Sequence, residues 1–237
     1  MIGETMFPTF AVLYAGLAGV STILGGLPSF HRKASTLSAR YMVAFASGVI
    51  IAAALFEMIP SADVAGNWPF LGAGFFIFYL VERVVMVHTC GENECELKSV
   101  GWVTLAGMSA DNFTDGIAIA VGYLTDPLLG LFIAIAIIVH ELPQSLTITL
   151  VMKASGYSTK KILANLFTGA ILYPAGAALS GLFPSGVYDQ VVALVAGEFL
   201  FIGAGELLPE AHKRFNIQVI ASVILGAVFV SALELLL

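Results

Sequence analysis

Charged residues are scarce in this chain of 237 residues: Asp, Glu, Lys and Arg together make up 11% of it. A soluble domain carries about 25% of them. Hydrophobic residues reach 59%, and the mean hydropathy is +0.95. These values exclude an ordinary soluble protein and predict an integral membrane protein. Residues 1–4 lack Lys and Arg, so the first apolar stretch does not have the positive start of a cleaved signal peptide. We expect it to be a spanning helix.

Long connections are also missing, because eight apolar stretches follow one another closely. They cover residues 5–27, 39–59, 68–87, 100–123, 128–152, 162–183, 187–208 and 217–237. About 20 apolar residues suffice for a helix to cross a bilayer. No linker or low-complexity run separates the stretches. The sequence therefore predicts one domain, residues 1–237, that is an all-α polytopic membrane protein with eight transmembrane helices.

Basic residues are absent from one side of this expected arrangement. All ten Lys and Arg residues fall at alternate ends of the stretches, whereas the opposite ends carry only the acids Glu4, Asp63, Asp126 and Asp189. Basic connections are cytoplasmic by the positive-inside rule. We therefore expect a multi-pass protein of the cell membrane with both the N- and the C-terminus extracytoplasmic.

Two polar clusters interrupt otherwise apolar stretches near their midpoints. The first contains Asp111, Asn112 and Asp115, and the second contains His140, Glu141 and Gln144. A carboxylate at the bilayer midplane costs about 2.5–3.5 kcal/mol. A cation held between the two helices would offset this cost. The alternative is an inert, hydrogen-bonded polar network between helices.

The spacing within each cluster suits metal binding. Asp111 and Asp115 are four residues apart, as are His140 and Gln144, so each pair lies on one helix face. Pro143 lacks an N–H group, so we expect a kink that frees a carbonyl oxygen for a cation or water. One imidazole among oxygen ligands suits Zn, Fe(II) or Mn(II). No Cys lies near either cluster.

An internal repeat joins residues 48–62 to residues 197–211. Gly, Glu, Pro and Ala recur at identical spacing as the pairs Gly48/Gly197, Glu57/Glu206, Pro60/Pro209 and Ala62/Ala211. The two stretches are expected to cross the membrane in opposite directions. This pattern indicates an inverted-topology repeat, which is common in secondary transporters. Chance similarity between two apolar segments is the alternative.

Taken together, these motifs resemble the ZIP (Zrt-, Irt-like) divalent metal-ion transporters. The resemblance rests on residues 111–116, 140–143 and 206–212 and extends over the whole chain. It implies a 3+2+3 arrangement of helices whose central pair, the fourth and fifth, holds the metal at the midplane. It implies uptake of zinc, with iron or manganese as further substrates, towards the cytoplasm. The metal would be cargo, so we expect no resident cofactor and no enzyme activity.

The family motifs differ from this chain at two positions. Asp111 and Gln144 both stand where many members have His, and no acid follows Gln144. The resemblance therefore implies one principal site of Asp111, Asp115, His140 and Glu141, with Asn112 and Gln144 secondary, rather than a binuclear centre.

Several residues outside the two clusters allow two interpretations. Glu57 and Glu206 would be entrance and exit ligands, or interfacial carboxylates beside helix-ending prolines. Glu210 and His212 would extend the exit path, or are solvated. The connection with His88, Cys90 and Cys95 collects metal or is a solvated loop. Glu198 and Glu234, expected near the outer ends of their helices, have no assigned role.

Two rival functions remain open at this point. A metal-gated receptor or channel would need a similar site. An intramembrane metallohydrolase would need His-Glu-x-x-His on an unbroken helix, but Gln144 replaces the second His and Pro143 precedes it. We expect divalent metal ions and membrane lipid as partners and no nucleic acid. The oligomeric state stays open, with a homodimer among the possible assemblies.

Overall fold

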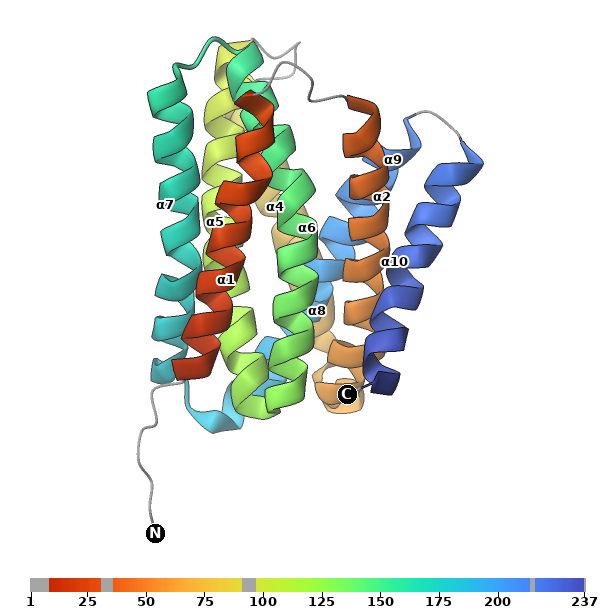
Figure 1. The fold of residues 1–237 in the computed structure, drawn as a ribbon. Helices are drawn as coiled ribbons and strands as arrows, with labels where there is room; N and C mark the ends of the chain where they lie inside the picture. The colour runs from red at the N-terminus through yellow and green to blue at the C-terminus, as the bar shows by residue number, and fades with distance from the viewer. Residues whose placement is uncertain (1–8, 31–35, 91–96, 214–215, 237) are drawn as a thin grey trace.

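The computed structural model describes residues 9–30, 36–90, 97–213 and 216–236, and this part of the chain is helical without any strand (Figure 1). It forms eight helical segments, some of them composite. These are α1 (Thr9–Gly26, then a 3-10 turn Leu27–Phe30), α2 (Thr36–Ala52, continued by a π-helix Ala53–Met58 and by α3, Ile59–Ser61), α4 (Val64–Cys90), α5 (Leu97–Thr125), α6 (Pro127–Ala154), α7 (Thr159–Leu179, then a 3-10 turn Ser180–Leu182), α8 (Tyr188–Leu200, preceded by a 3-10 turn Ser185–Val187 and continued by a π-helix Phe201–Leu207 and by α9, Leu208–His212) and α10 (Ile217–Leu236).

The predicted all-α membrane fold is confirmed. Seven helices of the described residues are long and apolar enough to cross a membrane. The eighth predicted span corresponds to α5, which carries Asp111, Asn112 and Asp115 and is less apolar for that reason. Large side chains such as Phe76, Ile171 and Leu225 are 66%, 65% and 60% exposed. Apolar exposure of this extent fits a surface that faces lipid.

The other helices pack around α5 and α6, each in contact with one or more neighbouring helices. Helix α1 contacts α6 and α7, α5 contacts α6 and α7, α2 contacts α10, and α4 contacts α8. Contacts of α2 with α6 and of α5 with α8 join these sets. The start of α1 and the end of α10 lie at one end of the bundle, and the α6–α7 turn, α9 and the start of α10 lie at the other (Figure 1). This arrangement places the midpoints of α5 and α6 inside the bundle.

Small residues allow the helices to approach closely. Ala11, Ala15 and Ala18 of α1 are fully buried. A Cβ atom on Gly19 of α1 would overlap the backbone carbonyl of Ala170 in α7. Close backbone contact through Gly and Ala is the usual way in which membrane helices associate, because lipid leaves little hydrophobic drive between them.

Pro143 and Pro209 lie inside helices that continue beyond them, so Pro209 does not end its helix as predicted. Helix α6 continues unbroken through Pro143 to Ala154. The helix that contains Pro209 continues to His212. Before Pro60 and Pro209 the chain adopts π-helix, in which Ile59 N–H donates to Ala54 O and Leu208 N–H donates to Gly203 O. The wider π turn accommodates the ring and the missing N–H that an α-helical turn tolerates poorly.

Candidate metal centre

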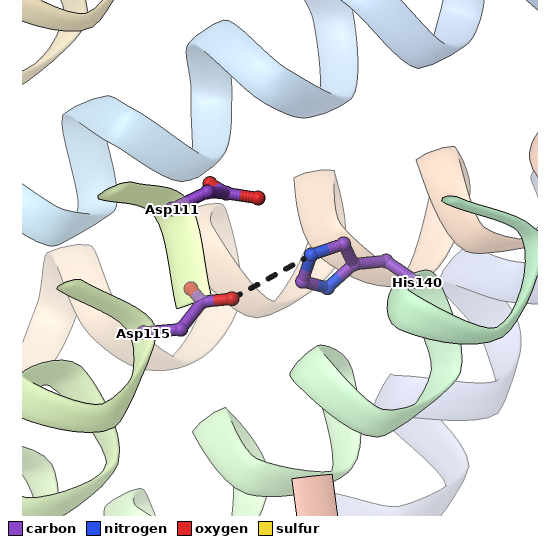
Figure 2. Close-up of side chains that lie close together, drawn as sticks. All are labelled: Asp111, Asp115 and His140. Atoms are coloured by element: carbon purple, nitrogen blue, oxygen red, sulfur yellow. Dashed lines mark ion pairs between the residues drawn. The ribbon is translucent and has the colours of Figure 1, made fainter. Parts of the chain in front are cut away.

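Asp111, Asp115 and His140 converge inside the bundle. The first two project from α5 and the third from α6 (Figure 2). One ligand atom of each lies within 4.8 Å of the others. His140 Nε2 is 3.7 Å from Asp115 Oδ2, and all three side chains are buried. The four-residue spacing on α5 therefore presents both carboxylates to one imidazole, as predicted for one helix face.

These ligand atoms have few partners within the protein. Both carboxylate oxygens of Asp115 and Nε2 of His140 are buried without a hydrogen bond. The other ring nitrogen, Nδ1, lies 3.3 Å from the carbonyl oxygen of Ala136. Donation from Nδ1 to a backbone carbonyl leaves a lone pair on Nε2, the usual arrangement of a metal-binding histidine. Buried polar atoms normally have partners, so the three side chains fit a bound cation.

Gln144 supports the group of three from the side of α6. Its Nε2 donates to Asp111 Oδ2 at 2.8 Å, whereas its own Oε1 is buried without a partner. The amide thereby fixes the orientation of the Asp111 carboxylate across the α5–α6 interface. Gln144 remains a candidate secondary ligand through Oε1.

Glu141 and Asn112 turn towards a different residue, Tyr173 of α7. The Tyr173 hydroxyl lies 2.6 Å from Glu141 Oε2 and 3.1 Å from Asn112 Oδ1. All three side chains are fully buried. Glu141 Oε1 and Asn112 Nδ2 have no hydrogen-bond partner. The structure thus brings the two predicted ligands into a polar group of their own, next to Asp111, Asp115 and His140 but outside that set.

Two residues of this region, Tyr173 and Glu198, were not predicted from the sequence as part of the site. Tyr173 carries no signal, because a tyrosine in an apolar stretch is ordinary. Glu198 does carry one, and its placement near a helix end was wrong. It lies midway along the helical segment from Tyr188 to His212, where a carboxylate is as costly as Asp111. It is fully buried, and its Oε1 accepts a hydrogen bond from Thr114 at 2.8 Å.

Glu57 and Glu206 are outside the group of Asp111, Asp115 and His140, and each lies in a π-helical segment. The Oε1 atom of Glu57 is buried without a partner, and Glu234 of α10 is a charged neighbour. Glu82 of α4 is a charged neighbour of Glu206. Their predicted entrance and exit roles remain predictions.

The remaining residues that were predicted to bind metal have less structural support. Glu210 forms a 2.6 Å ion pair with exposed Lys213, and His212 Nδ1 lies 2.9 Å from the carbonyl oxygen of Leu208, which fits a solvated end of the helix. The predicted metal-collecting loop with His88, Cys90 and Cys95 lies outside the residues whose side chains are described.

A bundle of helices able to span a membrane, around buried Asp115 and His140 ligand atoms that lack hydrogen-bond partners, defines a multi-pass membrane protein with a candidate cation site. The family model described as ZIP zinc transporter matches residues 87–234. The chain belongs to the ZIP zinc transporter family, as its motifs predict.

Two bacterial relatives match over almost their whole length. The chain is 27% identical to the zinc transporter ZupT of Chlorobium chlorochromatii, covering 100% of this chain and 99% of that protein. It is 26% identical to ZupT of Streptococcus mutans, covering 96% and 97%. The match to zinc transporter ZIP10 of Danio rerio, 28% identical, covers 50% of this chain and 15% of that longer protein.

Proposed function

We propose that the protein carries divalent metal ions, zinc and with it Fe(II) or Mn(II), across the cell membrane towards the cytoplasm. The cation site lies at the midplane between α5 and α6 and is built from Asp111, Asp115 and His140. The observation that carries this proposal is the set of buried ligand atoms on Asp115 and His140 without hydrogen-bond partners. The secondary ligands are Asn112, Glu141 and Gln144, with Glu57 at the entrance and Glu206 at the exit.

The proposed topology has eight spans, α5 included, and both termini outside. Its support is the distribution of charge over the bundle. Lys153, Lys160 and Lys161 adjoin the α6–α7 turn, and Lys213 follows α9. This turn and α9 lie opposite the start of α1 and the end of α10 (Figure 1). By the positive-inside rule the lysine-bearing end faces the cytoplasm.

An inverted repeat with a 3+2+3 arrangement finds support in glycine contacts. A Cβ on Gly48 of α2 would overlap Val223 O of α10, and one on Gly197 of α8 would overlap Leu71 O of α4. The reciprocal contacts pair Gly226 with Phe45 and Gly74 with Leu194. In each helix the contacted carbonyl lies three residues before the glycine. Helices α2 and α8 thus correspond, as do α4 and α10.

The π-helical hydrogen bonds also match α2 to α8. Ile59 N–H donates to Ala54 O, and Leu208 N–H donates to Gly203 O. Both bonds immediately precede the repeated prolines, Pro60 and Pro209. With α2 matched to α8 and α4 to α10, α1 and α7 form the remaining pair, and α5 and α6 lie between the two triplets.

Transport is best tested with purified protein in sealed vesicles that contain a zinc indicator. Asp115→Ala and His140→Ala are expected to remove most zinc binding and uptake while the protein still inserts and folds. Asp189→Ala, an acid on the exposed surface, is the matched control and is expected to keep both. Unchanged metal stoichiometry in the two site variants would contradict the proposal.

A second measurement separates a carrier from a channel or receptor. In a carrier with alternating access, cysteines introduced beside Glu57 and beside Glu206 change their reactivity in opposite directions when metal is added. A channel would expose both ends alike under all conditions, and a receptor would bind metal without any uptake.

A further inference from the structure

Glu198 brings a carboxylate from α8 to the edge of the Asp111–Asp115–His140 group. The Thr114 hydroxyl donates to Glu198 Oε1 at 2.8 Å, and Thr114 immediately precedes Asp115 on α5. Glu198 is fully buried, and its Oε2 has no hydrogen-bond partner. Asp111 and Asp115 lie on the same helix, three residues before and one residue after Thr114. The partnerless oxygen therefore lies at the level of the candidate metal centre.

A second contact holds α8 against the centre. The ring of Phe199, the next residue, packs edge-on against the His140 ring with 6.4 Å between centroids. Helix α8 thus contacts α5 through Glu198 and Thr114, and α6 through Phe199 and His140. These contacts bring α8 to both helices that supply Asp111, Asp115 and His140.

A role in helix packing alone explains Glu198 poorly. A buried carboxylate in the membrane costs about 2.5–3.5 kcal/mol or more. One hydrogen bond to a charged group returns about 1.5–3 kcal/mol, and the neighbouring Asp111 and Asp115 are acids of the same sign. A neutral glutamine would keep the bond to Thr114 without the penalty. A cation shared with the nearby acids offsets the cost for all of them.

We propose that Glu198 is a ligand of the transported cation, contributed by α8 to the site of Asp111, Asp115 and His140. This inference rests on the proposed transport function. Glu198 lies beyond the three side chains whose ligand atoms are within 4.8 Å of one another, so Oε2 has to turn inwards when a cation binds. Oε1 can keep its bond to Thr114 during this rotation. The completed site would offer four side chains, which matches the preference of Zn for four ligands.

Because Glu198 lies on α8, a cation that it binds would affect how α8 is held against α5 and α6 during transport. Asp111, Asp115 and His140 all belong to α5 and α6. Glu198 belongs to α8, which continues into the π-helical segment that contains Glu206. A cation bound by Glu198 therefore joins α8 to the α5–α6 pair. Loss of this ligand is expected to weaken cation binding and to remove the link that the bound cation makes between α8 and the α5–α6 pair.

Glu198→Gln isolates the charge, because it keeps the size of the side chain and an acceptor for Thr114. We expect Zn²⁺ binding to purified protein to weaken about tenfold or more, equivalent to about 1.4 kcal/mol. The thermal stability of the metal-free protein should stay unchanged or rise. The visible absorption spectrum of bound Co²⁺ should change, because one oxygen ligand is lost. Glu234→Gln, a glutamate on exposed α10 surface, is the control and should leave affinity and spectrum unaltered.

Two further variants keep the test decisive. Glu198→Asp retains the charge at a shorter reach and should bind Zn²⁺ with intermediate affinity. Thr114→Val removes the hydroxyl that orients the carboxylate and should weaken binding less than Glu198→Gln. If Glu198→Gln does not fold, an unaltered affinity and Co²⁺ spectrum in Glu198→Asp overturns the proposal.

The outcomes also separate this inference from the proposed function. Wild-type affinity and an unchanged Co²⁺ spectrum in Glu198→Gln, with binding lost in Asp115→Ala, would show that the centre binds metal without Glu198. Retention of binding and uptake in Asp115→Ala would instead overturn the transport site itself.

Discussion

The hydroxyl of Tyr173 lies 2.6 Å from Oε2 of Glu141, and this contact divides the buried polar residues of α5 and α6 into two groups. Glu141 Oε2 and Asn112 Oδ1 each lie within hydrogen-bond distance of the Tyr173 hydroxyl, although Glu141 Oε1 and Asn112 Nδ2 have no partner. Asp115 and His140 Nε2, in contrast, have no such partner. The division favours one principal cation site, because the residues that a second site would draw on are already bonded to α7.

Tyr173→Phe tests whether this bond is structural. The variant leaves the Glu141 carboxylate buried with one partner fewer. We expect the protein to lose about 1–3 kcal/mol of unfolding free energy and to keep most of its zinc uptake, since the hydrogen bonds of Tyr173 go to Glu141 and Asn112 and not to the ligand atoms of Asp115 or His140. Thermal unfolding in detergent and vesicle uptake measure the two quantities. In a double-mutant cycle with Glu141→Gln, additive losses would contradict a direct interaction.

Asp111 is expected to control metal selectivity. Its carboxylate makes the site richer in oxygen, and oxygen ligands favour Mn(II) and Fe(II) relative to Zn. Asp111→His adds a nitrogen ligand and removes a negative charge, so the ratio of Zn to Mn uptake should rise several-fold, whereas Cu(II) is not carried by either protein. Competition between the metals during vesicle uptake measures the ratio. An unchanged ratio would mean that Asp111 is not a ligand.

Acidification is expected to slow uptake. Metal ligands must be deprotonated to bind, so protons compete with the cation for Asp115, Glu141 and His140. The initial uptake rate should therefore fall as pH is lowered from about 7 to about 5 on both sides of the membrane. His140→Ala vesicles supply the background leak. A rate that rises steadily on acidification would be incompatible with ligand protonation as the dominant effect.

The glycine contacts predict a matched pair of stability effects. Gly48→Ala places a methyl group against the Val223 carbonyl and should destabilise the protein by about 1–3 kcal/mol through overpacking. Gly72→Ala of α4 meets no atom within 4 Å and should be neutral or stabilise by up to about 1 kcal/mol. Gly197→Ala should behave like Gly48→Ala if the two halves are equivalent. Equal stabilities of the Gly48→Ala and Gly72→Ala proteins would contradict the close α2–α10 contact.

The sequence by itself determined the membrane class, the helical segments, the family and the position of the main polar residues. These depend on local properties: runs of apolar residues, spacing within one helix and short motifs. Asp111, Asp115 and His140 were predicted together because four-residue spacing and shared midplane depth bring such residues close on neighbouring helices.

Only the tertiary structure decided which polar side chains meet. The rotation of each helix about its axis depends on contacts between residues far apart in the chain, such as Gly197 with Leu71. That rotation turns Glu141 towards Tyr173 and Glu198 towards Thr114. It therefore separates residues that adjoin in sequence, Asn112 from Asp111 and Glu141 from His140, and brings a carboxylate from α8 to the centre. The spacing of polar residues within one helix shows which of them share a face. It does not show towards which neighbouring helix that face is turned, because contacts between helices decide this.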